Sequence, residues 1–533
     1  MKILFVATRK NCDPSDRELY EMDFMNEFLG LKRSLLDLGL LTVAACTPDR
    51  FEVEVHDEYI SPIDFDTDAD LIALSAKTSA VARAYQVADE FRRRGKKVVL
   101  GGIHASLRPN EALEHVDYVV IGEAEQTWPK FLEQFEKGEA PTITDAQGFP
   151  EMDSIPVPAW DKIDYGKFLF HQVQSTRGCP FTCRFCSVPD ISGSTFRFKP
   201  PNKILEEIRA FPKTGFMDRV KTIYFVDDNF LSRPQYTEQL LKEMIPLRKR
   251  GEIPSWSAET TLNVTNRAGL LDLFVEAGCT TLIIGIESIN EATLLDMDKR
   301  VNFCVKYQDA MERIHSRGMS VVGNFIVGFD TDTLNVFDDI LDFIDENNIL
   351  YPFFSILTPM PGTKLHDDFK NDGRMDHFDW GLYDTRHVVF EPKNMTREQL
   401  MDGYCYLFEQ AYASERALNR LEKYWEKYRK QSSGFIEKTI VKWRLRKYRG
   451  KVSPEFDFIM DEGWKRLNKP GIKTDVAQLL YYLDSAHFVE YLNKFRSKDY
   501  EKNVEIFNQA ADKKISDDDL SKRQWDHKNK LSA

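Results

Sequence analysis

The chain has 533 residues, of which 42% are hydrophobic and 29% charged, and its formal net charge is -13 at pH 7. This length allows about three domains of roughly 150 residues, while no apolar run reaches the roughly 18 residues that a membrane-spanning helix needs. Nucleic-acid binding depends on a surplus of Lys and Arg, so the acidic balance weighs against nucleic acid as a partner. The first apolar run starts directly at the initiator Met without a basic region, which predicts a strand rather than a signal peptide, and a cytoplasmic protein.

Residues 1–148 alternate short apolar runs with helical stretches, a pattern typical of a doubly wound parallel α/β domain. The strands that we expect are Lys2–Ala7, Phe51–His56, Leu71–Ser75, Lys97–Leu100 and Tyr118–Ile121. Between two of them, residues 81–95 place apolar side chains on one helical face and end in a glycine, as helices commonly do. The fold class predicted for this domain is Rossmann-like or flavodoxin-like.

Three prolines in the segment FPEMDSIPVPAW, at residues 149–160, can continue neither a helix nor a central strand, so we place a linker at residues 149–165. A second alternation predicts a partial (β/α)6 barrel at residues 166–379. Its expected strands are Val173–Thr176, Thr222–Val226, Trp256–Glu259, Thr281–Ile286, Val321–Val327 and Phe353–Leu357. Charged helical stretches rich in Trp and Tyr then predict a helical C-terminal domain at residues 380–533, which frays from about Ser516.

Three cysteines with C-x-x-x-C-x-x-C spacing, Cys179, Cys183 and Cys186, follow the first expected barrel strand. The carboxyl ends of barrel strands are where such folds place their active sites. Three thiolates on a four-iron cluster leave one iron open to chelate the amino and carboxylate groups of a small molecule. The alternative is structural zinc, which needs a fourth ligand such as His171 or a distant cysteine. The other cysteines have no ligand-like spacing and are expected to be core thiols: Cys46, Cys279, Cys304 and Cys405.

The cysteine trio, with Phe185 directly before its last member, resembles the signature of the radical S-adenosylmethionine (SAM) superfamily, and the resemblance covers residues 173–365. It implies a 4Fe-4S cluster that cleaves SAM to a 5'-deoxyadenosyl radical, with electrons from a donor such as flavodoxin or ferredoxin. It also implies a SAM site. Its expected contacts are Asp227, Asp228 and Asn229 for the methionyl amino group, Lys299 for the carboxylate, Glu287 for the ribose and Gly328 for the adenosyl group. Taken singly, each of these could instead be a turn or cap residue.

The segments LSAKTS, GGIHAS and VIGEAE each end a strand of the first domain, at the edge where open parallel sheets bind ligands. Before a radical SAM barrel, these segments resemble the cobalamin-binding domain of the class B radical SAM methylases. The resemblance implies cobalamin contacts from Ser75, Thr78, Gly101, Gly102, His104, Gly122 and Glu123. The D-x-H-x-x-G motif that supplies a cobalt-ligating His is absent. We therefore expect cobalt without a protein His ligand and a hydrogen-bonded His104, and we assign no ligand role to Cys12.

The combined resemblance predicts a cobalamin-dependent radical SAM enzyme that methylates an unactivated carbon of a small molecule or lipid. No side-chain base could remove hydrogen from such a carbon, so the cofactors must carry the step. Two alternatives stay open: a non-methylating cyclase or rearrangase of the anaerobic Mg-protoporphyrin monomethyl ester cyclase type, and a non-catalytic cobalamin-binding sensor. A tRNA methylthiotransferase is disfavoured because extra N-terminal cysteines are missing and the chain is acidic.

The segment FIEKTIVKWRLRKYRGK, residues 435–451, combines apolar residues at helical spacing with a basic cluster. Its apolar members are Phe435, Ile436, Ile440 and Trp443. The commoner interpretation is a helix whose apolar stripe packs on the barrel while its charges face water. The alternative is an interfacial helix on anionic lipid, with peripheral membrane contact that would suit a lipid substrate.

Overall fold

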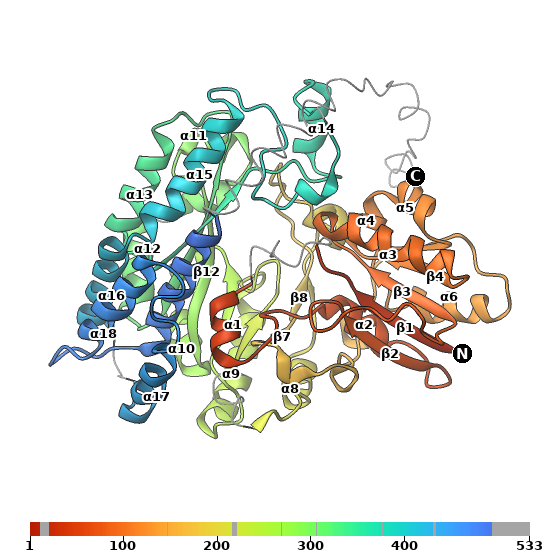
Figure 1. Cartoon of the computed structure of the whole chain (residues 1–533), viewed down its shortest axis with the longest axis horizontal. Helices are drawn as coiled ribbons and strands as arrows, with labels where there is room; N and C mark the ends of the chain where they lie inside the picture. Colours follow the sequence, from red (N-terminus) through yellow and green to blue (C-terminus); the bar gives the residue numbers. More distant parts are fainter. Residues whose placement is uncertain are drawn as a thin grey trace.

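The computed structural model describes residues 1–10, 21–146, 148–215, 221–267, 269–304, 306–375, 377–429 and 433–492. Two parallel sheets form its two halves, the N-terminal sheet on the right of Figure 1 and the second sheet on the left. Cys12 and the polar stretch from Ser516 lie outside the described residues. None of the helices in the described ranges combines the length and the apolar character that crossing a bilayer requires.

The N-terminal sheet has six parallel strands in the order β2-β1-β3-β4-β5-β6. Their bounds are Lys2–Ala7 (β1), Glu52–Asp57 (β2), Leu71–Ser75 (β3), Lys97–Gly101 (β4), Tyr118–Ile121 (β5) and Ile143–Asp145 (β6). The order reverses between β1 and β3, which is the flavodoxin-like arrangement, so the predicted doubly wound sheet is confirmed. The sequence did not predict β6, because this three-residue strand is not buried and forms no apolar run.

Helices cover both faces of this sheet, which explains why its strands are apolar on both sides. Leu4 and Val6 of β1 pack beneath α3 (Val81–Arg93), α4 (Ile103–Leu107) and α5 (Pro109–His115). Ile3 and Phe5 of the same strand face α2 (Leu38–Ala45) and α6 (Thr127–Glu136).

The second sheet has six parallel strands in the order β7-β10-β11-β12-β13-β14, so each strand lies beside its predecessor in the sheet, as in the predicted partial barrel. The bounds are Phe170–Val173 (β7), Thr222–Phe225 (β10), Trp256–Thr260 (β11), Cys279–Glu287 (β12), Ser320–Val327 (β13) and Tyr351–Ile356 (β14). The intervening helices include α8 (Pro201–Arg209), α9 (Pro234–Lys249), α10 (Leu270–Ala277), α12 (Tyr307–His315) and α13 (Val336–Glu346).

The first barrel strand differs from the prediction, because β7 ends at Val173 rather than Thr176. The N–H groups of Ser175 and Thr176 donate to the Asp227 carboxylate at 2.6 and 2.8 Å and so leave the strand ladder. A short antiparallel hairpin follows, formed by β8 (Thr176–Arg177) and β9 (Arg197–Phe198). The loop between its two strands carries the three clustered cysteines.

The C-terminal part is helical, as predicted, with α15 (Arg397–Ala411), α16 (Ser414–Tyr428), α17 (Phe435–Leu445), α18 (Pro454–Leu467) and helical residues 476–492. The apolar faces of these helices share one continuous core with the barrel. Three residues of the segment that precedes them pack elsewhere, since Trp380, Tyr383 and Val389 belong to the core beneath the N-terminal sheet. Close by, the Lys10 ammonium lies 2.6 Å from the buried Asp384 carboxylate.

One N-terminal helix, α1 (Asp23–Leu29), lies apart from its own sheet and against the opposite half of the molecule (Figure 1). The Phe24 ring contacts Tyr448 and Phe456, with ring centres 5.1 and 5.0 Å apart. The Met25 N–H donates to Asp484 at 2.8 Å. Packing therefore connects segments from the two ends of the described chain.

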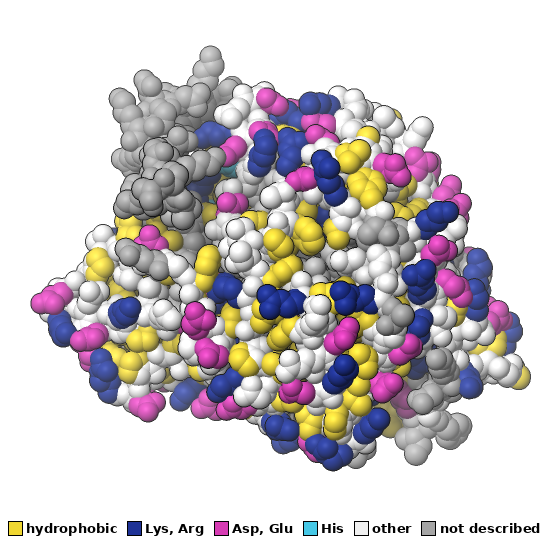
Figure 2. All heavy atoms as spheres, turned by 180° about the vertical axis from the view of Figure 1, so that it is seen from behind, with side chains coloured by type: hydrophobic (Ala, Val, Ile, Leu, Met, Phe, Trp, Pro, Cys, Tyr) yellow, Lys and Arg dark blue, Asp and Glu magenta, His cyan; other side chains and the backbone are white. Residues whose placement is uncertain are grey.

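The surface seen from behind carries Lys and Arg side chains interspersed with Asp and Glu (Figure 2). This mixed pattern accompanies the formal charge of -13 of the whole chain.

Candidate active site

The cysteine loop begins where β8 ends, and tight backbone contacts hold its first residues. Gly178 has a φ of 83°, and a side chain there would collide with the carbonyl oxygen of Thr195. Its N–H donates to Asp228 at 3.0 Å, and the next N–H, of Cys179, donates to the Gly193 carbonyl at 3.1 Å. The loop closes with a hydrogen bond of 3.0 Å from the Cys186 N–H to the Cys183 carbonyl.

The three thiols of this loop form no disulfide and are partly exposed. Burial raises the pKa of each, that of Cys186 to about 12, and the nearby Lys299 ammonium offsets only part of the effect. Thiolates are the form that ligates metal, so loading a cluster on this loop would release protons.

The donor set fits an iron-sulfur cluster better than structural zinc. In the described ranges, no three His, Cys, Asp or Glu side chains converge on the position of one metal ion. A 4Fe-4S cluster does not require such convergence, because each thiolate binds a different iron. His171, the candidate fourth zinc ligand, is buried with its Nδ1 2.7 Å from the Tyr165 hydroxyl and its ring stacked on Phe211.

Two further cysteines, Cys279 and Cys405, are buried as predicted for core thiols, whereas Cys46 is half-buried. The side chain of Cys304 lies outside the described residues.

An ion pair lies beside the cysteine loop. Glu287 ends β12 at a register shift, with a φ of 62° that non-glycine residues seldom adopt. Its carboxylate accepts a hydrogen bond of 2.9 Å from the Lys299 Nζ. Burial alone would lower the pKa of Lys299, but Glu287 and the Cys183 thiol outweigh it and raise that pKa above its usual value. The ammonium also lies 6.0 Å from the centre of the Phe185 ring.

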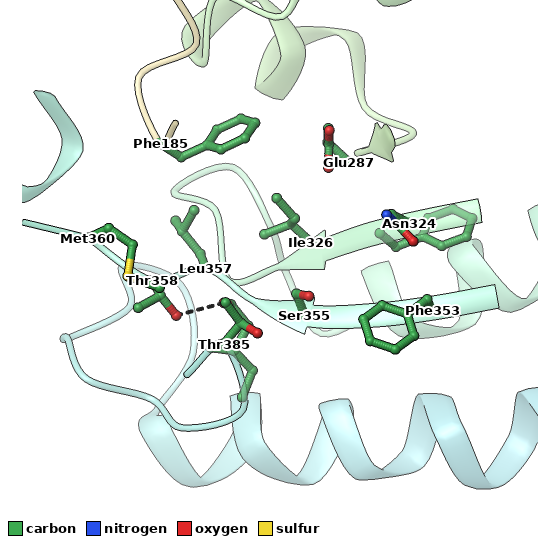
Figure 3. Close-up of a pocket in the computed structure, with 12 residues that line it drawn as sticks. Phe185, Glu287, Asn324, Ile326, Phe353, Ser355, Leu357, Thr358, Met360 and Thr385 are labelled. Carbon is green, nitrogen blue, oxygen red and sulfur yellow. Dashed lines mark hydrogen bonds between the residues drawn. The ribbon is translucent and has the colours of Figure 1, made fainter. Parts of the chain in front are cut away.

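A cavity of about 200 Å³ opens beside this pair (Figure 3). Phe185 and Glu287 face it from one side and the ends of β13 and β14 from the other. Its lining also includes Asn324, Ile326, Phe353, Ser355, Leu357, Thr358, Met360 and Thr385. Mostly apolar walls with a few polar groups are typical of small-molecule sites.

The strand residues of this cavity were not predicted from the sequence, although a signal for them was present. Asn324 and Ile326 on β13, like Phe353 and Ser355 on β14, stand two residues apart and so point to one face of the sheet. Polar residues at such positions in otherwise buried strands indicate that this face of the sheet borders a cavity.

Asp227, whose SAM contact stays a prediction, bonds the backbone just before the cysteine loop. Its buried carboxylate accepts from both Ser175 and Thr176, including the Ser175 hydroxyl at 2.5 Å. Burial raises its pKa to about 7 in spite of these hydrogen bonds. Asp228 holds Gly178, and Asn229 accepts from the Leu231 N–H at 3.2 Å. Asp227 and Asp228 thus hold the chain at the entry to the cysteine loop.

Gly328 also has a structural explanation. Its φ is 102°, and a side chain there would lie 2.8 Å from Leu400 and 3.3 Å from Phe390. Its N–H donates to Asp332 at 2.9 Å. Leu400 and Phe390 of the C-terminal part therefore fill the space that a side chain at this position would need.

The three strand-end segments of the N-terminal domain meet at one edge of its sheet. Gly102 follows β4 with a φ of 90°, and a side chain there would lie 2.9 Å from Ser75 Oγ and from the backbone of Ala76. The Ala76 N–H donates to the Gly101 carbonyl at 3.3 Å. Gly122 follows β5, with a φ of 78° and its N–H bonded to Ser106. Ser75, Gly101, Gly102 and Gly122 therefore form a closely packed rim.

His104 and Thr78 are buried below this rim. The two ring nitrogens of His104 lie 3.4 Å from the Thr78 hydroxyl and 3.3 Å from Glu111, and the ring meets Trp380 edge-on. Glu111 also accepts from the Trp380 Nε1 at 2.8 Å. This geometry favours the expected hydrogen-bonded role of His104 over cobalt ligation.

Glu123 follows Gly122 of the rim and contacts the hairpin that carries the cysteine loop. Its carboxylate pairs with Arg177 at 2.7 Å and with Arg197 of the β8–β9 hairpin. The cobalamin contact expected of Glu123 stays a prediction, and neither arginine was predicted from the sequence. The ion pairs bring the cobalamin-type edge and the cysteine loop together.

Comparisons with known proteins agree with this geometry. A radical SAM superfamily model matches residues 173–344, a B12 binding domain model matches residues 31–132, and a domain of unknown function (DUF4070) matches residues 363–453. Bacteriochlorophyllide d C-12(1)-methyltransferase of Chlorobaculum tepidum is 31% identical over 397 residues, which is 73% of this chain and 85% of the relative. Hopanoid C-2 methylase of Rhodopseudomonas palustris is 29% identical over 70% of this chain and 74% of its own.

Among solved structures, the cobalamin-dependent SAM radical enzyme OxsB, with aqua-cobalamin and SAM bound, has a TM-score of 0.59 at 14% identity. The match covers 94% of this chain and 81% of OxsB, and it shows the same fold. The chain therefore belongs to the cobalamin-dependent radical SAM superfamily. It is an enzyme of the methyltransferase class, with a 4Fe-4S cluster, SAM and cobalamin as cofactors.

The predictions of family, enzymatic function and cofactors are thus confirmed. The cyclase alternative has more distant support, since the anaerobic magnesium-protoporphyrin IX monomethyl ester cyclase of Cereibacter sphaeroides is 24% identical over 63% of this chain.

Proposed function

We propose that the enzyme transfers a methyl group to an unactivated carbon of a small and largely apolar molecule. The observation that carries this proposal is the cavity beside the cysteine loop, where Phe185, Ile326 and Phe353 provide apolar walls. Glu287, Asn324 and Ser355 add the few polar groups that can orient a substrate. Two relatives named for methylating bacteriochlorophyllide d and hopanoids support a substrate of this apolar kind.

The chain's own residues would divide the work of binding and orientation. Cys179, Cys183 and Cys186 would hold the cluster and leave one iron for SAM. Lys299, beside the thiols, is placed to neutralise the methionyl carboxylate, while Glu287 orients Lys299 and faces the cavity. Together the bound cofactors supply reductive SAM cleavage and a methyl carrier, driven by electrons from a donor of the flavodoxin or ferredoxin kind.

The closely packed rim of Ser75, Gly101, Gly102 and Gly122 is the surface that we assign to cobalamin. Glycines at this edge let a large ring system approach the backbone closely. The glycines stand at the carboxyl ends of parallel strands, where open α/β sheets bind ligands.

The test of methyl transfer uses SAM with a deuterated methyl group. The reduced, fully loaded enzyme is incubated with a metabolite extract from a strain that lacks the gene, and the products are compared by mass spectrometry. We expect a new product that carries the deuterated methyl group. A new product without the label would contradict methyl transfer and support a cyclase or rearrangase.

We also propose that α17 makes peripheral contact with an anionic membrane, which would give access to a lipid substrate. The side chains of Val441 and Leu445 are buried, so they form the packing face of this helix. Ile440 and Trp443, which the sequence analysis placed on the packing stripe, are instead 45% and 70% exposed. An exposed Trp at headgroup depth with basic neighbours is typical of interfacial helices.

The basic residues of α17 and of the turn that follows it differ in their surroundings. Lys438 turns inward, with its Nζ 2.8 Å from the Leu467 carbonyl and the Thr474 hydroxyl. Arg449 pairs with Asp461. The exposed basic side chains near Trp443 are Lys442, Arg446 and Lys447.

Co-sedimentation with phosphatidylglycerol vesicles at physiological salt tests this contact. The triple variant K442Q/R446Q/K447Q should bind more weakly by up to roughly 100-fold, because each basic residue near an anionic surface contributes about 1 kcal/mol. Arg449→Gln is the matched control and should change little, since Arg449 is paired with Asp461. Equal binding by the native protein and the triple variant would contradict the membrane role.

A further inference from the structure

A buried ion-pair network joins the two halves of the molecule at the cysteine loop. Glu123 and Glu125 come from the loop after β5, and Arg177 and Arg197 come from the β8–β9 hairpin. The two arginines stand opposite each other in the register of this hairpin. The four side chains are only 6% to 16% exposed, and their formal charges balance.

The network holds Glu123 from both strands of the hairpin. Arg177 Nη1 lies 2.7 Å from Glu123 Oε2 and 2.7 Å from Glu125 Oε1. Both terminal nitrogens of Arg197 donate hydrogen bonds to the Glu123 carboxylate, one of them at 3.0 Å, so the pair is bidentate. Such pairs fix orientation as well as distance, because the planar guanidinium must face the carboxylate edge.

The hairpin end of the network reaches the cysteines directly. Arg177 precedes Gly178 and Cys179 in the chain, and the Cys179 N–H is bonded to Gly193. Arg197 donates to the carbonyl of Ser192, the residue before Gly193, at 3.0 Å. Both sides of the cysteine loop are therefore tied to the arginines that bind Glu123.

The other end of the network reaches the rim assigned to cobalamin. Glu123 follows Gly122, whose left-handed conformation turns the chain out of β5. The Gly122 N–H is bonded to Ser106 of α4, the helix that begins directly after Gly102. A displacement of the cysteine loop would thus also move the rim, because buried ion pairs and not a flexible linker connect the two.

We propose that this network, Glu123 and Glu125 with Arg177 and Arg197, sets the separation between the cluster and the cobalamin. The four residues act as positioning residues, through the cysteine loop on one side and the rim on the other. This inference rests on the proposed assignment of the two cofactor sites. It identifies residues outside the cysteine loop and the cavity that keep two reacting cofactors in register.

Spin-spin coupling in the loaded protein tests the inference without a substrate. The reduced cluster and cob(II)alamin are both paramagnetic, and their magnetic interaction weakens steeply with distance. In the native protein we expect measurable relaxation enhancement of the cob(II)alamin EPR signal by the reduced cluster. Glu123→Arg and Arg197→Glu should each lose this enhancement while retaining iron and cobalamin, and the double variant E123R/R197E should regain part of it.

A surface pair provides the matched control. Arg50 pairs with Glu136 on an exposed part of the N-terminal domain, and Arg50→Glu should leave the coupling unchanged. If a charge reversal prevents folding, Glu123→Gln takes its place and should weaken the coupling. Unchanged coupling in loaded single variants, or a double variant no better than the singles, would overturn the inference. Failure of the native protein to bind cluster or corrinoid would instead overturn the proposed cofactor sites, and with them this inference.

Discussion

Replacing Lys299 by Met would leave the Glu287 carboxylate beside three thiols without its cation. We expect Lys299→Met to assemble the cluster but to bind SAM roughly 10- to 100-fold more weakly, because a hydrogen bond between charged groups contributes about 1.5–3 kcal/mol. The affinity can be measured by titrating SAM into the reduced protein and following the EPR spectrum of the cluster.

The matched control is Lys364→Met on α14 (Lys364–Asn371), where Lys364 forms an exposed pair with Asp368. Exposed pairs contribute little, so this variant should bind SAM like the native protein. An unaltered SAM affinity in Lys299→Met would remove the carboxylate contact from the proposal.

The hydrogen bonds of His104 lead to a second expectation. Because both of its ring nitrogens have hydrogen-bond partners, cob(II)alamin bound to the protein should show no splitting from a protein nitrogen. His104→Ala should leave the cobalt spectrum unchanged but lower the free energy of unfolding by about 2–4 kcal/mol, through the cavity it creates and the hydrogen bonds that Thr78 and Glu111 lose. Nitrogen splitting that disappears in this variant would show that His104 ligates cobalt after all.

The sequence could predict the cysteine trio because its spacing is local, but it could not predict what the carboxylates contact. Asp227 accepts hydrogen bonds from Ser175, 52 residues earlier in the chain, and Glu123 pairs with Arg197, 74 residues later. Such partners depend on how strands and loops are brought together in three dimensions. A motif therefore locates a carboxylate at a strand end without deciding whether it binds a cofactor or a neighbouring loop.

Among the elements, strands buried on both faces were predicted nearly to the residue. β1, β3 and β5 match the expected bounds because helices on both sides require continuous apolar runs. β7 was misplaced because it contains His171 and Gln172, two polar residues that a buried strand accepts only with partners. His171 bonds Tyr165, and the Gln172 side chain accepts from the Leu36 N–H at 2.7 Å.

The contact between α13 and α15 gives a test in which the usual effect of a substitution reverses. Alanine in place of a helical glycine normally stabilises by up to about 1 kcal/mol. On α15, however, a side chain at Gly403 would collide with the Phe337 ring of α13. We expect Gly403→Ala to lower the free energy of unfolding by about 1–3 kcal/mol, measured by denaturant titration.

A second substitution checks the cause. Phe337→Leu should make room for the added methyl group, so the double variant G403A/F337L should lose less stability than the two single losses combined. Simple additivity of the two losses would contradict the collision.

For the molecule as a whole, packing crosses the boundaries at residues 148 and 380 that the sequence suggests. α1 belongs to the core of the barrel and the C-terminal helices, and Trp380 belongs to the core of the N-terminal sheet. Hydrophobic patterning indicates which residues are buried, but it does not indicate which half of the molecule buries them. Packing therefore joins segments from either side of both boundaries.

This packing predicts that α1 stabilises the C-terminal helices, although it lies far from them in the sequence. Phe24→Ala removes ring contacts with Tyr448 and Phe456 and should lower the free energy of unfolding by about 3–5 kcal/mol. Phe458→Ala, at a ring that is 41% exposed, is the control and should cost about 0.5 kcal/mol or less. Equal losses in the two variants, measured by denaturant titration, would contradict the role of α1.

The docking of α1 also has a consequence for how the protein is made. The Met25 amide and its Asp484 partner are 459 residues apart in the chain. A ribosome adding about 5–20 residues per second separates their appearance by roughly 20–90 s. During that interval the apolar face of α1 has been synthesised and its covering helices have not. Nascent chains should therefore depend on chaperones, and slower growth at low temperature should raise the soluble yield more than a stronger promoter.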